Sequence, residues 1–220
     1  MPTIKRVRLL LGCVLALVAG LAFAAPAAPR IGVMTMQPGE IFWERFGHDA
    51  IVVDDPARGE PVSYNFGFFD PSEPDFIPRF IRGQMRYQLV ALPMREDLAY
   101  YREVGRGVSI QWLHLTPAQA TKLADALAVN ALPQNARYNY DYFTDNCATR
   151  VRDAIDRALD GRLQRQLSAR SRGNTYRSEA VRQIRARQRA AAGLRVPGML
   201  GALEVLAARP GAAGADAFGD

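Results

Sequence analysis

The hydrophobic pattern of the chain changes period several times, and each change marks a predicted element. Strand-like residues at 48–53 and 62–67 flank a turn-rich segment at 54–61, which predicts a β-hairpin. Residues 85–92 and 108–115 predict two further strands.

Helical spacing marks segments between and after these strands. Thr116 and Pro117 supply an N-cap and a first helical residue for a helix that extends to about residue 130. A later helix carries Val151 and Ile155 on one face. Further helices are predicted at 76–82, 96–104 and 178–189. The order, a few strands and then helices with strands between them, favours an α+β domain over a doubly wound sheet.

The N-terminus has the three parts of a secretory signal peptide. Basic residues precede an apolar stretch at 9–23, and an Ala-Phe-Ala sequence ends at Ala24, as a signal peptidase requires. The apolar stretch is short for a membrane span. We therefore predict a signal peptide at 1–24 that is cleaved on export to a bacterial periplasm. The Leu-Leu-Gly sequence before Cys13 is similar to a lipoprotein processing box, but it leaves almost no apolar stretch, which argues against a lipid anchor.

Removal of the leader leaves about 195 residues, enough for one sizeable hydrophobic core. We predict one domain at 30–165, an arginine-rich helical extension at 166–210 and a disordered tail at 211–220. The formal charge of +6 falls to +3 without the three cations of the leader. Most remaining arginines lie in the C-terminal third, where they would contact anionic lipid head groups or form a solvated helical face. Nucleic acid is not an expected partner of an exported protein.

Cys147 is the only cysteine outside the leader. Exported proteins usually pair their thiols or lack them, so an unpaired thiol at a predicted helix start is a candidate nucleophile. The N-terminus of a helix stabilises thiolate. The base must be a histidine, and His48, which follows Gly47 at the start of a predicted strand, is favoured over His114. His114 shares a strand face with apolar residues, which predicts a structural role. No metal and no other cofactor is expected, because two histidines and one cysteine have no recognised zinc spacing.

Three motifs follow one another along the chain. They are Phe46-Gly47-His48-Asp49-Ala50-Ile51, Tyr64-Asn65-Phe66-Gly67 and Asp145-Asn146-Cys147-Ala148-Thr149-Arg150. Over roughly residues 39–156 this pattern resembles the N-terminal periplasmic domain of the Lnb-type lipoprotein N-acyltransferases, long catalogued as a domain of unknown function. The order of histidine before cysteine is also similar to circularly permuted, papain-like NlpC/P60 proteins, including the lecithin:retinol acyltransferase group. The resemblance implies that residues 30–165 form a permuted NlpC/P60 domain with an antiparallel sheet and C-terminal helices.

The resemblance also implies roles for individual residues. Cys147 would be the nucleophile and His48 the base. In the permuted fold the strand after the histidine supplies an orienting group. Asn65 is preferred because its amide carbonyl can accept from the imidazole N–H, and Tyr64 is the alternative. The backbone N–H of Cys147 would form the oxyanion site, with Asn146 or a nearby tyrosine hydroxyl.

Three functions fit these observations. The first is a thiol acyltransferase or acyl hydrolase that forms an acyl-Cys147 intermediate with phospholipid or lipoprotein, its arginine-rich helices contacting the membrane. The second is a cell-wall peptidase or amidase of the NlpC/P60 type. The third is a non-catalytic periplasmic binding module.

Overall fold

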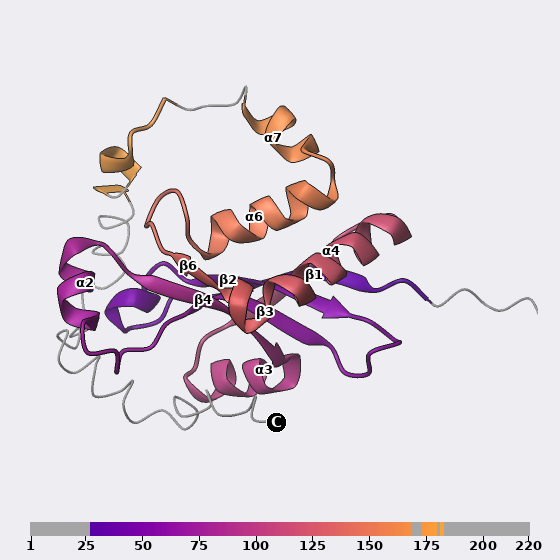
Figure 1. Ribbon diagram of the computed structural model, residues 1–220, viewed down its shortest axis with the longest axis horizontal. Helices are drawn as coiled ribbons and strands as arrows, with labels where there is room; N and C mark the ends of the chain where they lie inside the picture. The colour runs from indigo at the N-terminus through magenta and orange to yellow at the C-terminus, as the bar shows by residue number, and fades with distance from the viewer. Residues whose placement is uncertain (1–26, 169–172, 180, 183–220) are drawn as a thin grey trace, which may run out of the picture.

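The computed structural model describes residues 27–168, 173–179 and 181–182. These residues form a mixed α/β fold around one six-stranded sheet (Figure 1). Every pairing in the sheet is antiparallel, and the strand order is β5-β1-β2-β3-β4-β6. The strands are β1 (Arg30–Met36), β2 (His48–Asp54), β3 (Val62–Phe68), β4 (Arg86–Pro93), β5 (Val108–Trp112) and β6 (Arg137–Asn139).

Helices cover both faces of the sheet (Figure 1). Two of them, α4 (Pro117–Asn130) and α6 (Cys147–Ala158), pack on one face, and α3 (Met94–Glu103) packs on the other. The shorter helices are η1 (Phe42–Glu44), α2 (Phe76–Arg82), α5 (Pro133–Ala136) and α7 (Arg162–Leu167).

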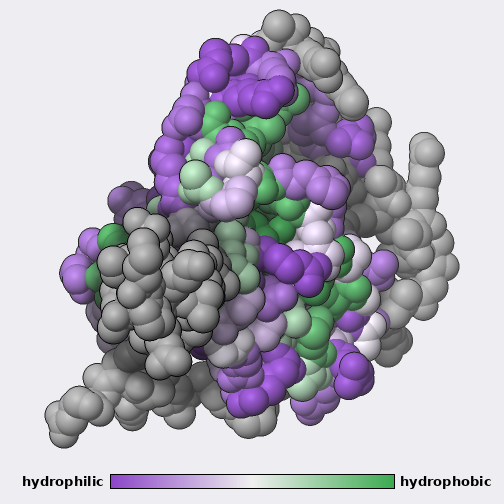
Figure 2. Space-filling view, turned by 90° about the vertical axis from the view of Figure 1, so that its right-hand side faces the viewer, coloured by the Kyte–Doolittle hydropathy of each residue, from purple (hydrophilic) through white to green (hydrophobic). Residues whose placement is uncertain are grey.

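Successive side chains of β2 point to opposite faces of the sheet and so contribute to two layers of the core. Ile51 and Val53 pack with α4 and α6, while Ala50 and Val52 pack with Tyr101 of α3. All four β2 side chains are buried because β2 lies inside the sheet and is covered on both faces. Figure 2 shows one end of the molecule, where apolar residues fill the middle of the view between hydrophilic rims. The position of β2 at the centre of this core gives its first residue, His48, a rigid support.

The structure confirms the predicted hairpin, the strand at 85–92 and the helices that begin near residues 76, 96 and 117. The predicted strand at 108–115 is too long. It ends at Trp112, which pairs with Gly32 as the last pair of the β1–β5 ladder. His114 consequently lies exposed after β5, so its predicted position on an apolar strand face is wrong.

Five elements were not predicted: β1, η1, α5, β6 and α7. The predicted leader, the tail at 211–220 and most of the helix at 178–189 lie outside the described residues. Within the part of the chain that the structure describes, no helix is long and apolar enough to cross a membrane.

Candidate active site

Cys147 is the first residue of α6, and Asn146 caps the helix. The side-chain oxygen of Asn146 accepts from the backbone N–H of Thr149 at 3.0 Å. In return, the backbone N–H of Asn146 donates to the hydroxyl of Thr149 at 2.8 Å. This reciprocal capping box explains why the helix begins at Cys147. It places the thiol at the end of the helix whose dipole stabilises negative charge.

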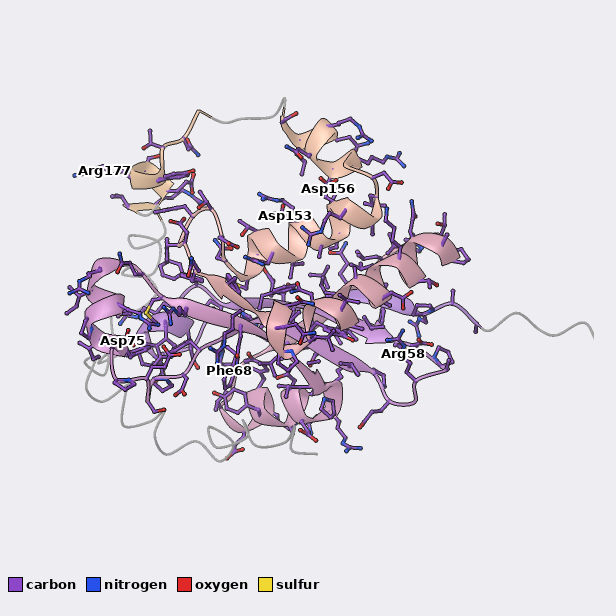
Figure 3. All side chains as sticks on the ribbon, viewed as in Figure 1. Arg58, Phe68, Asp75, Asp153, Asp156 and Arg177 are labelled. Atoms are coloured by element: carbon purple, nitrogen blue, oxygen red, sulfur yellow. The ribbon has the colours of Figure 1, made fainter. Side chains whose placement is uncertain are left out.

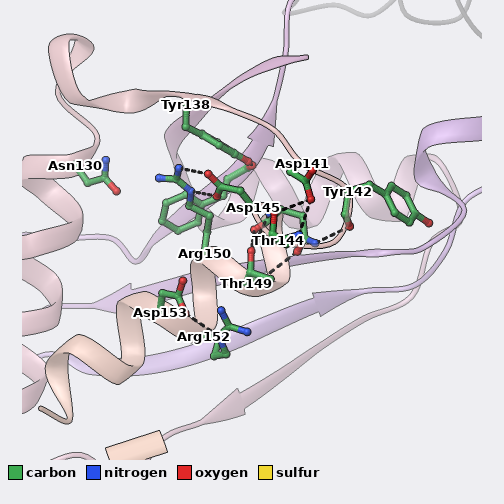
Figure 4. A network of polar contacts seen from close by, with 12 residues as sticks. Asn130, Tyr138, Asp141, Tyr142, Thr144, Asp145, Thr149, Arg150, Arg152 and Asp153 are labelled. Atoms are coloured by element: carbon green, nitrogen blue, oxygen red, sulfur yellow. Dashed lines mark hydrogen bonds and ion pairs between the residues drawn. The ribbon is translucent and has the colours of Figure 1, made fainter. Parts of the chain in front are cut away.

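The loop before Cys147 has hydrogen bonds of its own (Figure 4). One oxygen of Asp141 accepts from two backbone N–H groups of the loop, at 2.9 and 2.7 Å. Asp145 forms a two-bond ion pair with Arg150 of α6, at 2.5 and 2.7 Å. The guanidinium of Arg150 also lies 4.0 Å from the ring centroid of Tyr138. These contacts attach the loop to both α6 and the end of the sheet.

The thiol of Cys147 is hydrogen-bonded to the imidazole of His48. Burial raises the pKa of Cys147, but the hydrogen bond and charge of His48 and a hydrogen bond from the backbone of Asp49 bring that pKa below its ordinary value. Burial lowers the pKa of His48, but the hydrogen bond and charge of Cys147, with a hydrogen bond to Asn65, raise it overall. The opposite shifts favour a thiolate–imidazolium pair. Cys147 as a residue is only partly buried.

Two glycines set the position of the imidazole. Gly47 has a φ of +77°, and a Cβ there would lie 2.7 Å from the carbonyl oxygen of Met36. On the neighbouring strand, a Cβ on Gly67 would lie 2.5 Å from Cε1 and 2.9 Å from Nδ1 of His48. The imidazole therefore occupies space that exists only because residue 67 has no side chain.

Asn65 contacts the other edge of the imidazole. Its Oδ1 lies 3.1 Å from Nε2 of His48, and its Nδ2 donates to the carboxylate of Asp97 at 2.6 Å. A carboxylate only accepts hydrogen bonds, so the amide nitrogen must face Asp97 and the carbonyl oxygen must face His48. The Nε2–H of His48 therefore donates to Asn65, which leaves Nδ1 for the thiol of Cys147. The structure thus brings together the three residues that the sequence proposed as nucleophile, base and orienting group.

Other candidate residues lie elsewhere. Tyr64 points to the opposite face of β3 and is buried in the core with Ile51, which leaves no orienting role for it. The side-chain nitrogen of Asn146 donates to the backbone carbonyl of Tyr142 at 2.9 Å, so both ends of this amide support the loop and the helix. Its contribution to an oxyanion site stays a prediction.

Three tyrosines, Tyr87, Tyr138 and Tyr140, lie near enough to Cys147 for its charge to affect their pKa values. Burial raises the pKa of Tyr138 and of Tyr140, and the nearby charge of Cys147 raises each further. The hydroxyl of Tyr138 donates to the backbone carbonyl of Phe66. Tyr140 stacks on Tyr87 with 4.2 Å between ring centroids. Because the hydroxyl proton of Tyr138 is already used, Tyr140 is the better candidate for a tyrosine donor at the oxyanion site.

Sequence reasoning missed Gly67 and Asp97. The role of Gly67 is steric and depends on the pairing of β2 with β3, which no local pattern reports. A signal for Asp97 was present, since it lies four residues before Tyr101 and therefore on the buried side of α3. Among the described residues, no group of three or more histidine, cysteine or acidic side chains is arranged to hold a metal.

The fold and the site together define a mixed α/β protein with a Cys–His–Asn arrangement at one end of the central strands of an antiparallel sheet. The family described as the Lnb N-terminal periplasmic domain matches residues 21–184. The chain therefore belongs to this family, which supports the expected periplasmic location. Comparisons with curated proteins and with solved structures gave no match.

Removing the cap of α6 is expected to lower the stability of the fold and the reactivity of the Cys147 thiol. Asn146→Ala should lower the free energy of unfolding by about 1 kcal/mol, because the first turn loses its side-chain acceptor. Fraying of that turn should also slow alkylation of Cys147 at neutral pH. Thr116→Ala removes the equivalent cap of α4, far along the chain from the thiol, and serves as the control. Denaturant unfolding should show a similar loss of unfolding free energy for both variants. Only Asn146→Ala should slow the alkylation of Cys147. Equal alkylation rates in the two variants would contradict a role of the Asn146 cap in activating the thiol.

Proposed function

We propose that this chain is a periplasmic thiol acyltransferase or acyl hydrolase that forms an acyl-Cys147 intermediate with phospholipid or lipoprotein substrates. The observation that carries the proposal is the hydrogen-bonded pair of Cys147 and His48, with Asn65 on the far side of the imidazole. A thiolate at a helix N-terminus beside an imidazolium is the arrangement that thioester chemistry requires.

In the first step the thiolate of Cys147 attacks the carbonyl carbon of an ester or amide. A C–S bond forms and the carbonyl oxygen becomes an oxyanion. The backbone N–H of Cys147, in the first turn of α6, has no acceptor within the helix and is placed to stabilise this oxyanion. Collapse of the intermediate breaks the bond to the leaving alcohol or amine, which takes its proton from the imidazolium of His48.

In the second step water or an amine attacks the thioester. Neutral His48 accepts the proton of the attacking group, and the C–S bond breaks to restore the thiolate of Cys147. Asn65 keeps the imidazole in one orientation through both proton transfers. Attack by water makes the protein a hydrolase, and attack by an amine makes it an acyltransferase.

Apolar side chains beside the pair support a substrate with a hydrocarbon chain. Phe46 lies two residues before His48, and Tyr142 lies in the loop before Cys147. Their rings pack edge to face with 5.1 Å between centroids, and they remain 44% and 41% exposed. An exposed aromatic pair in the segments that carry His48 and Cys147 offers apolar contact area to an acyl chain.

The chain order supports the finer proposal that this is a circularly permuted NlpC/P60 fold. The strand that carries His48 precedes the helix that begins with Cys147, and α6 packs against β2 and β3. The nucleophile helix therefore follows the histidine strand along the chain and covers the same sheet.

Charges of both signs line the hollow between α6 and α7, including Asp153 and Asp156 (Figure 3). Arg152 pairs with Asp153 at 2.7 Å. Local pairing of this kind reduces the positive potential that would attract anionic lipid. Peripheral membrane contact through the arginine-rich helices stays a prediction, and the proposed chemistry does not depend on it.

The proposal is tested by incubating the protein with phospholipid that carries a labelled acyl chain. We expect a labelled adduct that hydroxylamine removes, because hydroxylamine cleaves thioesters. Cys147→Ser should give no hydroxylamine-sensitive label at neutral pH, since a hydroxyl is not ionised by the imidazole as a thiol is. Equal labelling of Cys147→Ser would contradict the proposal.

The same preparation distinguishes the alternatives. Release of stem-peptide fragments from purified peptidoglycan, without any lipid adduct, would identify a cell-wall peptidase or amidase. A thiol that is alkylated slowly at neutral pH, with the pH dependence of a free cysteine, would identify a non-catalytic module.

A further inference from the structure

A buried carboxylate lies behind Asn65. Asp97 of α3 is only 6% exposed, although acidic side chains are almost never buried without partners. Its Oδ2 accepts from the side-chain nitrogen of Asn65 at 2.6 Å and from the hydroxyl of Ser63 at 2.5 Å. Both donors come from β3, so the carboxylate links helix and strand beneath the candidate active site.

The partners of this carboxylate determine which way the amide of Asn65 faces. An asparagine amide can rotate by half a turn and exchange its oxygen for its nitrogen. With Asp97 in place, the nitrogen must face the carboxylate, because the opposite orientation would set two acceptors against each other. The oxygen is then held toward Nε2 of His48, at 3.1 Å.

We propose that Asp97 is a positioning residue: by fixing the amide of Asn65 it keeps the proton of His48 on Nε2 and directs Nδ1 to the thiol of Cys147. The inference rests on the proposed function, because it assumes that the Cys147–His48 pair is used. The contacts that it uses run through four elements, from α3 through β3 and β2 to the start of α6. A purely structural Asp97 would stabilise the packing of α3 on β3 and leave the reactivity of the thiol unchanged.

The test compares two substitutions at the same position. Asp97→Ala removes the acceptor at 2.6 Å and leaves the Asn65 nitrogen only the longer contacts to Ser63, at 3.3 and 3.5 Å, so the amide is held less firmly against rotation. Asp97→Asn keeps one carbonyl oxygen, and one is sufficient because both donors converge on Oδ2. Glu96→Ala removes the adjacent, exposed carboxylate of α3 and is the matched control.

The readout is the rate of alkylation of Cys147 as a function of pH, measured on protein shown to be folded by thermal unfolding. For Asp97→Ala we expect a rate at pH 6 at least tenfold below the wild type and a profile displaced toward that of an ordinary thiol. Asp97→Asn should restore the rate to within about threefold, and Glu96→Ala should match the wild type. Alkylation needs no lipid, so the role of Asp97 can still be tested if the protein forms no acyl adduct.

A second measurement reports the imidazole directly. The chain has two histidines, so nitrogen-15 labelling of histidine gives two ring systems, and exposed His114 serves as the internal reference. The spectrum of the wild type should show His48 protonated at Nε2 when neutral, and Asp97→Ala should show a mixture of tautomers. An unchanged tautomer and an unchanged alkylation profile in folded Asp97→Ala, with His48→Ala still impaired, would overturn the inference and leave the proposed pair standing. A wild-type profile that His48→Ala does not alter would overturn both.

Discussion

His48→Ala is expected to slow alkylation of Cys147 at pH 6 by at least tenfold. Without the imidazole, the thiol loses the hydrogen bond and positive charge that lower its pKa, while burial continues to raise it. Each unit by which the pKa of the thiol rises removes about nine-tenths of the thiolate present at acid pH. Part of this loss is offset, because a more basic thiolate is a stronger nucleophile.

The direction of the two pKa shifts also predicts the shape of the wild-type profile. The pKa of Cys147 is lowered, so the rate should rise at a more acid pH than it does for a free thiol. The pKa of His48 is raised, so the imidazolium partner persists above the pH at which histidine usually loses its proton. Both shifts increase the share of the thiolate–imidazolium pair, and His48→Ala should leave one transition of the thiol at higher pH.

His114→Ala is the matched control, because His114 is exposed and lies after β5. It should follow the wild-type profile throughout. If His48→Ala and the wild type gave the same profile, the hydrogen-bonded pair would not exist in solution and the proposed chemistry would fail with it.

Gly67→Ala is expected to reduce the formation of the acyl adduct by about 100-fold, since a displacement of about 1 Å at a reacting group can have an effect of this size. The new methyl group would lie 2.5 Å from Cε1 of His48, a distance that real contacts do not allow. The imidazole would have to leave the position in which it contacts Asn65 and Cys147. The measurement is labelled-acyl transfer to the protein at saturating lipid.

Gly107→Ala provides the comparison. A Cβ at this position would lie 2.9 Å from the end of the Gln37 side chain, which is exposed and free to turn aside. This variant should keep wild-type labelling and a similar melting temperature. If folded Gly67→Ala were labelled as fast as the wild type, the space beside residue 67 would not be what positions the imidazole.

Local signals predicted many of the elements. Thr116 starts α4 through a capping box with Gln119, Pro117 is the first residue of that helix, and Gly83 ends α2 with a φ of +68°. These features act within one turn of the chain, so a sequence of neighbouring residues contains them completely. The start of α6 at Cys147 is of the same kind, because Asn146 and Thr149 cap it.

The strands β1 and β6 were harder to predict. β6 has three residues, and its pairing with β4 makes it a strand. β1 lies between β5 and β2 and buries residues on both faces, so it lacks the alternation that marks a half-exposed strand. Pairing with distant segments decides both cases, and such pairing has no local sequence signature.

The sequence by itself determined which reactive groups this protein has: one thiol outside the predicted leader, two histidines, and a helix that begins at the thiol. Only the tertiary structure decided which groups meet. The register of β2 with β3 sets His48 against Gly67, the packing of α3 brings Asp97 to Asn65, and the packing of α6 brings Cys147 to the imidazole. These contacts join segments that are distant along the chain, and their geometry depends on the whole core because the sheet and its two helical layers fix every distance between them.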